Sequence, residues 1–114
     1  MELVDLQREY LADVTTTIET MREQARALAA HGTFKSAFPA LLFHAHQLKG
    51  SGGSIGFPRI SDVADAMRRE LNLFLDDART DRPTPAELSR KIVALTDELA
   101  SEVHSAACPA SSSS

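Results

Sequence analysis

The chain has few aromatic residues and almost no cysteine. Its 114 residues include no tryptophan, one tyrosine, five phenylalanines and one cysteine, Cys108. With so few aromatic side chains, a hydrophobic core has to be filled by Leu, Ile, Val, Ala and Met. A lone cysteine cannot form a disulfide within the chain, which argues against a secreted module stabilised by disulfides. Cys108 also has no nearby base, and we expect no role for it.

Excess positive charge and long hydrophobic runs are missing as well. Twelve basic and sixteen acidic side chains leave a formal net charge of −4, whereas nucleic-acid binding depends on clustered positive charge. No run approaches the ~20 apolar residues that a membrane helix needs. No charged-then-apolar signal peptide opens the chain. We therefore expect a cytoplasmic protein that binds neither nucleic acid nor a membrane.

What the sequence does have is helical periodicity along most of its length. Apolar residues recur three or four positions apart, and the alternation typical of strands is not seen. This pattern, in a chain of the usual length for one domain, predicts an all-α fold, an antiparallel up-down four-helix bundle that is monomeric. The bundle is expected to occupy residues 1–105. Residues 106–114, which end in four serines, are expected to form a disordered tail.

The first helix is expected from Glu2 to Ala30. Its apolar residues form one stripe: Leu3, Leu6, Tyr10, Val14, Ile18, Met21, Ala25 and Leu28. Gly32 follows as a candidate C-cap, because a left-handed backbone costs glycine nothing. The block Thr15–Thr17 favours helix poorly and could bend this helix or divide it in two.

The second helix is expected from Ala37 to Ile55. Pro39 limits where it starts, because proline is tolerated in the first turn but deeper in a helix clashes with the preceding turn. Ser36 is then the predicted N-cap. One core-facing seam is predicted: Phe38, Leu41, Ala45, Leu48, Gly52 and Ile55.

The third helix is expected to begin at Phe57-Pro58 and the fourth at Thr84. The predicted seam of the third is Ile60, Val63, Ala64, Met67, Leu71, Phe74 and Ala78. In the fourth, Thr84 is the predicted N-cap, Pro85 takes the first helical position and Glu87 completes a capping box. The core-facing residues of the fourth helix are Leu88, Ile92, Leu95, Leu99 and Val103.

Glycines crowd the end of the second helix, although each one inside a helix costs roughly 0.5–1 kcal/mol relative to alanine. They are Gly50, Gly52, Gly53 and Gly56. His46 lies one turn before them, with Lys49 and Gly50 as its neighbours three and four positions on. Gly53 continues the same column of the helix surface.

This layout suits a histidine that carries a phosphoryl group. A neutral imidazole offers a nucleophilic ring nitrogen, which is what accepting a phosphoryl group requires. Lys49 can offset the negative charge of the phosphoryl oxygens. The missing side chains at Gly50 and Gly53 would let a partner protein approach closely, which would explain glycine inside a helix.

The string from His46 to Ser51, His-Gln-Leu-Lys-Gly-Ser, followed by Gly56, resembles the signature of histidine-containing phosphotransfer (HPt) domains. These domains are four-helix bundles of two-component phosphorelays, and the helix pattern from Leu3 to Val103 fits them. The resemblance implies that His46 accepts a phosphoryl group from a receiver-domain aspartate and passes it to another. It further implies that Lys49 assists electrostatically and that Gly50 leaves room for the phosphoryl group and the receiver.

The resemblance also implies partners and chemistry. The partners would be response-regulator receiver domains and a hybrid sensor histidine kinase of a bacterial-type phosphorelay. Mg²⁺ would be bound by the receiver, and this chain would bind no cofactor and have no autokinase activity. Many family members carry a glutamine on the following helix that hydrogen-bonds the active histidine. Counting without gaps from His46, that position is Arg68, which could contact the phosphoryl group or point to solvent.

Several residues near His46 are candidates for partner binding. Leu42 and Phe43 precede it by about one turn and would form an apolar patch if they are exposed. Phe57 could extend that patch, and Gln47 and Gly53 complete the predicted partner-binding set.

Other interpretations of the same residues are weaker. His44 and His46 point about 200° apart on a helix and have no Cys or Glu-x-x-His partners, so we expect no metal site. The glycine segment lacks the Gly-x-x-x-x-Gly-Lys-Ser/Thr order and a preceding strand, which argues against nucleotide binding. The alternative from another class is a non-catalytic adaptor that binds a receiver or kinase without carrying phosphate. A free-standing protein and a module of a hybrid kinase fit the sequence equally well.

Overall fold

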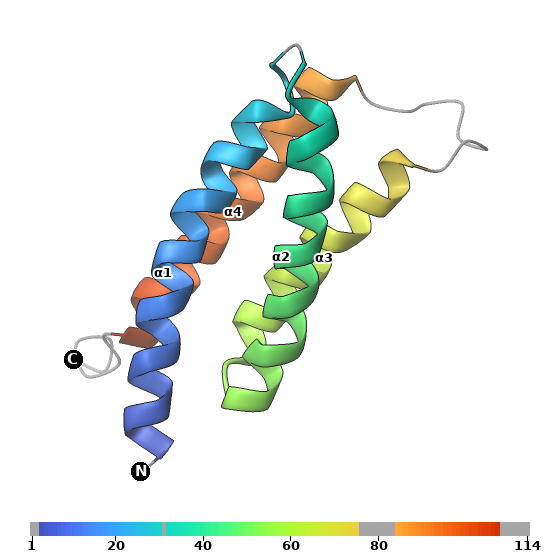
Figure 1. The fold of residues 1–114 in the computed structure, drawn as a ribbon. Helices are drawn as coiled ribbons and strands as arrows, with labels where there is room; N and C mark the ends of the chain where they lie inside the picture. The colour runs from blue at the N-terminus through green and yellow to red at the C-terminus, as the bar shows by residue number, and fades with distance from the viewer. Residues whose placement is uncertain (1–2, 31, 76–83, 108–114) are drawn as a thin grey trace.

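Four helices run alternately up and down through the protein (Figure 1). The computed structural model describes residues 3–30, 32–75 and 84–107. Its helices are α1 (Leu3–Ala27), α2 (Phe34–Ile55), α3 (Pro58–Phe74) and α4 (Pro85–Ala107), and these described ranges contain no strand. The predicted all-α four-helix bundle is therefore confirmed. No helix in this part of the chain is long and apolar enough to cross a membrane.

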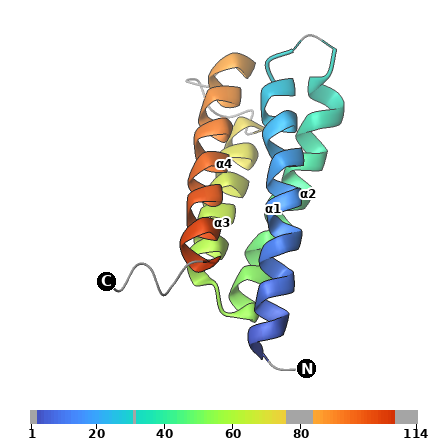
Figure 2. The same ribbon diagram turned by 90° about the vertical axis from the view of Figure 1, so that its left-hand side faces the viewer.

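The helices form a closed ring in which each packs against two others. The contacts join α1 to α2, α2 to α3, α3 to α4 and α4 back to α1. In Figure 2 the α1–α4 pair lies in front of the α2–α3 pair. The seam between α2 and α3 is therefore on the side of the bundle opposite the seam between α1 and α4.

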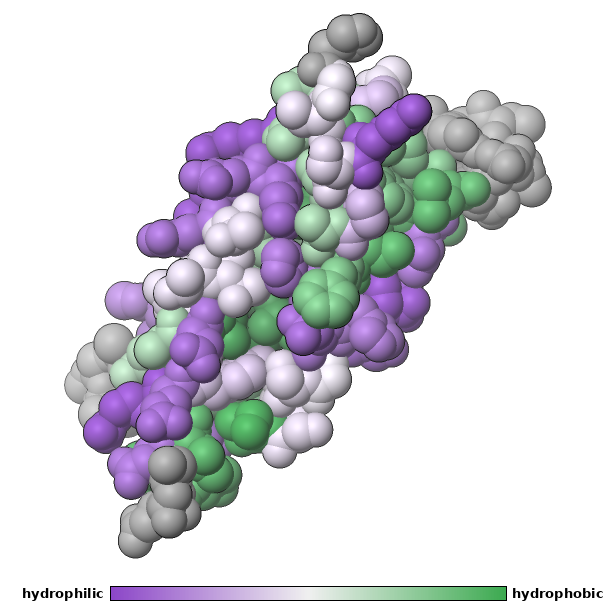
Figure 3. Space-filling model, viewed as in Figure 1, coloured by the Kyte–Doolittle hydropathy of each residue, from purple (hydrophilic) through white to green (hydrophobic). Residues whose placement is uncertain are grey.

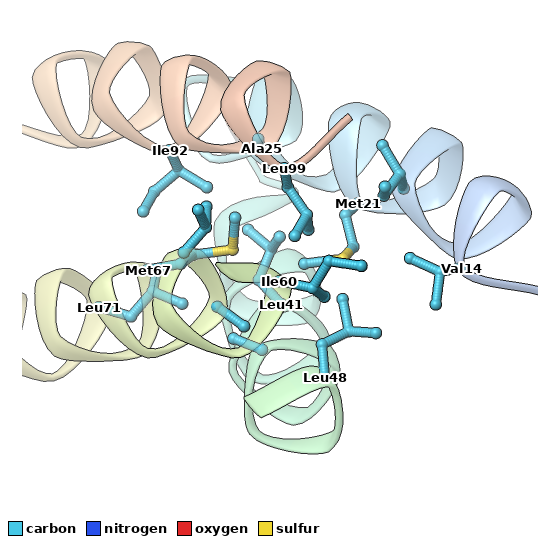
Figure 4. Packing of buried hydrophobic residues seen from close by; sticks show 14 of the residues in the cluster. Val14, Met21, Ala25, Leu41, Leu48, Ile60, Met67, Leu71, Ile92 and Leu99 are labelled. Carbon is cyan, nitrogen blue, oxygen red and sulfur yellow. The ribbon is translucent and has the colours of Figure 1, made fainter. Parts of the chain in front are cut away.

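The centre of the bundle is aliphatic, as the composition predicts. Side chains from all four helices point toward one another there (Figure 4), and those fully buried include Met21, Leu41, Ile60, Met67, Leu71, Ile92 and Leu99. Two polar side chains, Ser89 and Thr96, are buried as well. Their hydroxyls donate to the carbonyls of Ala25 and Ile92, so neither lacks a hydrogen-bond partner.

Helix α1 is continuous through the threonine block, so the suggested division into two helices is wrong. The hydroxyls of Thr15 and Thr17 donate to carbonyls four residues earlier, so both bond to the backbone of their own helix. The helix ends at Ala27, three residues before the predicted end, and the chain then turns. Gly32 has the predicted left-handed backbone, with a φ of 88°, but it lies five residues beyond Ala27 and is not the C-cap of this helix.

The predicted apolar stripe of α1 fails at its N-terminal end. Leu3 and Leu6 are exposed, whereas Leu11, which the stripe left out, is buried. Figure 2 shows the first turns of α1 extending past the end of α4. Among the described residues, these turns therefore have no helix on that side to pack against. Periodicity alone cannot reveal where the neighbouring helix ends.

Helix α2 begins three residues earlier than predicted, and Pro39 lies inside it. Thr33, not Ser36, is the N-cap residue, and its carbonyl accepts hydrogen bonds from the amides of Ser36 and Ala37. The ring of Phe34 lies 5.4 Å from that of Phe38, a contact that the extra turn makes. Pro39 is solvent-exposed, and it has no N–H to donate to the carbonyl four residues earlier.

Helix α4 starts as predicted and ends later. Thr84 and Glu87 form the reciprocal capping box: the Thr84 amide donates to Glu87 Oε1 at 3.0 Å, and the Glu87 amide donates to Thr84 Oγ1 at 3.2 Å. The helix continues to Ala107, two residues beyond the predicted domain boundary at 105. The rest of the predicted tail, 108–114, and the seam residue Ala78 lie outside the described residues.

Candidate functional site

His46 lies on the outer surface of α2, about midway along the helix. The seam residues Ala45 and Leu48 on either side of it are buried against the core. Because successive helical residues are about 100° apart, burying these two turns the imidazole of His46 toward solvent. Exposure of the ring is the first requirement for a histidine that reacts with a partner protein.

The imidazole is part of a shallow hollow between α2 and α3. Residues of both helices line it: Pro39, Leu42, Phe43, His46, Arg68 and Asn72. Arg68 lines this hollow together with His46, and its guanidinium is hydrogen-bonded to Asp65. Leu42 and Phe43 border the same hollow, and Phe43 is 58% exposed. The hollow thus combines an exposed imidazole, a cation and an apolar rim.

The cations near His46 converge on one carboxylate, Asp65 of α3. Lys49 Nζ lies 3.3 Å from Asp65 Oδ1, and Arg68 donates to the same oxygen through Nε at 3.1 Å and Nη2 at 2.8 Å. Arg69 Nε lies 3.3 Å from Oδ2. The hydrogen bonds from Arg68, followed by the contribution of Lys49, hold the pKa of Asp65 below its ordinary value. Asp65 is therefore ionised at neutral pH.

Sequence reasoning missed Asp65. Its spacing from Arg68 and Arg69, three and four residues, is a recognisable signal for ion pairs along one helix. Its contact with Lys49, however, depends on how α3 is placed along α2. Two contacts accompany that placement. At Gly52 a Cβ would meet the amide nitrogen of Ser61 at 2.9 Å. The Ser61 hydroxyl donates a hydrogen bond to the Lys49 carbonyl at 2.6 Å.

The glycines of α2 therefore differ in what surrounds them. A Cβ at Gly50 would meet nothing within 4 Å, so this position faces open space. A Cβ at Gly53 would make only an ordinary contact with the Ser61 hydroxyl, at 3.8 Å. Gly56 is the left-handed C-cap of α2, with a φ of 104°. Gly52 is the one at which α3 approaches too closely for a side chain.

Three of the predicted partner-binding residues, Gln47, Gly53 and Phe57, do not line the hollow. Gln47 is exposed on the side of α2 that faces α1, where it lines a groove with Tyr10 and Ser51. Phe57 is stacked on Tyr10 beside the α2–α3 turn. Burial raises the pKa of Tyr10, and its hydrogen bond to Ser51 opposes this shift. Leu42 and Phe43 are the members of the set that share the hollow with His46.

The other histidine of α2 lies apart from the hollow, and the described residues form no metal centre. His44 Nδ1 lies 3.2 Å from Gln24 Oε1 of α1, so this ring is turned away from His46. No group of three or more His, Cys, Asp or Glu side chains that could hold a metal ion occurs within the described ranges. On the face seen in Figure 3, apolar side chains reach the surface in separate places among polar ones.

Comparison with known proteins gives one match. A family model described as Hpt domain matches residues 5–104. No curated protein and no solved structure matches the chain. The matched range includes the whole of α2 and α3, and therefore every residue of the hollow.

Proposed function

Because the chain belongs to the Hpt domain family, whose members carry phosphoryl groups in phosphorelays, we propose that His46 is its phospho-accepting residue. The observation that supports this assignment is the hollow itself. It places the solvent-exposed imidazole of His46 beside Arg68 and an apolar rim, with Lys49 one turn along the helix. His44, the nearest other histidine, is turned toward α1.

The proposed reaction is a reversible transfer between an aspartate and His46. The unprotonated ring nitrogen of His46 attacks the phosphorus of an aspartyl phosphate on a receiver domain. The N–P bond forms as the P–O bond to the aspartate breaks, and the electron pair of that bond leaves with the carboxylate. The phosphorylated ring retains a proton on its other nitrogen, which can pass to water. Attack by a second receiver aspartate reverses these steps and regenerates the neutral imidazole.

The other residues of the site help this transfer in different ways. Lys49 and Arg68 offset the charge of the phosphoryl oxygens, Lys49 as a point charge and Arg68 through its fixed set of N–H donors. Gly50 leaves open space on the side where the receiver approaches. Leu42 and Phe43 supply apolar surface for docking next to the reacting ring.

The same proposal extends to the partners. They are response-regulator receiver domains and a hybrid sensor histidine kinase, and the receiver supplies Mg²⁺ with the carboxylates that bind it. This chain acts as a phosphocarrier in a bacterial cytoplasm and does not use ATP itself.

Labelling from a receiver domain tests the proposal. A receiver phosphorylated on its aspartate with radioactive acetyl phosphate is freed of small molecules and mixed with the chain. We expect alkali-stable, acid-labile phosphate on the wild type and none on His46→Gln. The matched control is His44→Gln, which should label as wild type does, because that ring lies outside the hollow. Unlabelled wild type that still binds the receiver would instead indicate the non-catalytic adaptor.

A further inference from the structure

We propose that Asp65 is a positioning residue that competes with the phosphoryl group on His46 for Lys49 and Arg68. This inference rests on the proposed function of His46. It assigns Asp65 the task of keeping the phosphorylated form from becoming too stable, so that the group remains transferable to the next aspartate.

Asp65 engages both cations of the site at once. A single oxygen, Oδ1, lies 3.3 Å from Lys49 Nζ and accepts two hydrogen bonds from Arg68. Lys49 comes from α2 and Arg68 from α3, so the carboxylate joins the two helices that flank the hollow. Each cation would otherwise be a long, freely rotating side chain.

Lys49 and Arg68 both keep N–H donors that Asp65 does not use. An arginine has five N–H donors and a lysine three, and the contacts to Asp65 Oδ1 use two from Arg68 and one from Lys49. Arg68 lines the hollow that contains His46, and Lys49 is a neighbour of His46 on the same helix face. A phosphoryl group on His46 would therefore meet cations that are already held near it.

The charges around Asp65 decide how it acts on a phosphoryl group. Three cations, Lys49, Arg68 and Arg69, surround the one carboxylate of Asp65, which leaves a local charge of +2. A phosphoryl group brings nearly two negative charges. The Asp65 carboxylate repels that group and draws on the same donors, so it raises the free energy of the phosphorylated state relative to the free state.

The test measures an equilibrium rather than a rate. A receiver domain that labels the wild-type chain is phosphorylated with acetyl phosphate, purified, and incubated with the chain and Mg²⁺ until the distribution of phosphate is constant. In Asp65→Asn the side chain keeps its shape and loses its charge. We expect the ratio of phosphohistidine to phosphoaspartate to rise about two- to fivefold, the size typical of a partly exposed charge interaction.

Two controls separate this effect from general charge and from folding. Asp97→Asn removes the same charge from an interhelical Arg–Asp pair, that with Arg22 between α1 and α4, and should leave the ratio unchanged. In a background of Lys49→Ala and Arg68→Ala, Asp65→Asn should change the ratio only slightly, because the donors for which Asp65 competes are gone. If thermal unfolding shows that Asp65→Asn is not folded, Asp65→Ser removes the same charge and is measured in its place.

The outcomes distinguish this inference from the proposed function. A ratio that is unchanged or lowered in a folded Asp65 variant overturns the competition. The same holds if Asp97→Asn raises the ratio equally, since the effect would then be one of net charge. By contrast, wild-type chain that takes no label, or His46→Gln that labels fully, overturns the assignment of His46 itself.

Discussion

Gly50 and Gly52 are two residues apart, yet their surroundings are opposite. Gly50 faces open space, whereas α3 approaches Gly52 so closely that a Cβ would meet the Ser61 amide nitrogen at 2.9 Å. In the sequence both are glycines inside a helix, where each costs stability, and partner approach was the reason predicted for Gly50 alone of the two. The structure explains Gly52 by helix packing and leaves Gly50 as the glycine that packing does not require.

Alanine substitutions should separate the two glycines. Gly50→Ala should raise the free energy of unfolding by about 0.5–1 kcal/mol, because alanine favours helix and meets no neighbour. Gly52→Ala should lower it by about 1–3 kcal/mol, because α2 and α3 have to move apart. Urea denaturation measures both changes. If Gly50 keeps space for the receiver, Gly50→Ala also slows phosphotransfer despite its greater stability. A Gly52→Ala protein as stable as wild type would contradict this account of the contact.

A site residue could be predicted where the residues it acts with lie close to it in the sequence. His46, Lys49 and Gly50 belong to one short motif on one helix, and all three are solvent-exposed on α2 as predicted. Arg68 could be located by counting, but not oriented. Asp65 was missed because its contact with Lys49 joins two helices, and the relative placement of α2 and α3 is not visible in either segment alone.

At the scale of the helix, local signals predicted some ends and missed others. The start of α4 was predicted correctly because a capping box involves only residues three apart, Thr84 and Glu87. The start of α2 was predicted wrongly because it depends on Phe34, whose ring lies 5.4 Å from Phe74 of α3. A contact across forty residues outweighed the local preference for proline in a first turn.

The capping box makes a prediction about pH. The hydrogen bond from the Thr84 amide lowers the pKa of Glu87 in the folded protein. The unfolded chain then binds the proton more readily, so this contribution to stability is present above the ordinary glutamate pKa and is lost as pH falls through the lower folded value. Glu87→Gln cannot titrate, and its free energy of unfolding should therefore fall less than that of wild type between about pH 5 and 3. Urea denaturation across this range measures the difference. Parallel curves for the two proteins would show that the hydrogen bond contributes nothing in solution.

Across the whole molecule, the surface proposed to react is separate from the interior that stabilises the fold. The ring order of the helices places the His46 hollow on α2 and α3, while the core is filled by aliphatic side chains from all four helices. Little of the hollow is needed to close the core, since His46 and Phe43 are both exposed. The surface residues are thus free to match a partner without a large effect on stability.

A pair of substitutions should show this separation directly. Phe43→Ala should raise the dissociation constant for a receiver domain about five- to tenfold, as expected for loss of an aromatic contact at the centre of an interface. Because Phe43 is 58% exposed, the free energy of unfolding should change by less than about 0.5 kcal/mol.

Ile92→Val, in the fully buried core, should do the reverse: it should lower the free energy of unfolding by about 0.5–1.5 kcal/mol and leave receiver affinity unchanged. Titration calorimetry and urea denaturation measure the two quantities on each variant. Receiver binding that is insensitive to Phe43→Ala would move the docking surface away from the apolar rim of the hollow, whereas a large loss of stability in that variant would mean that Phe43 belongs to the fold.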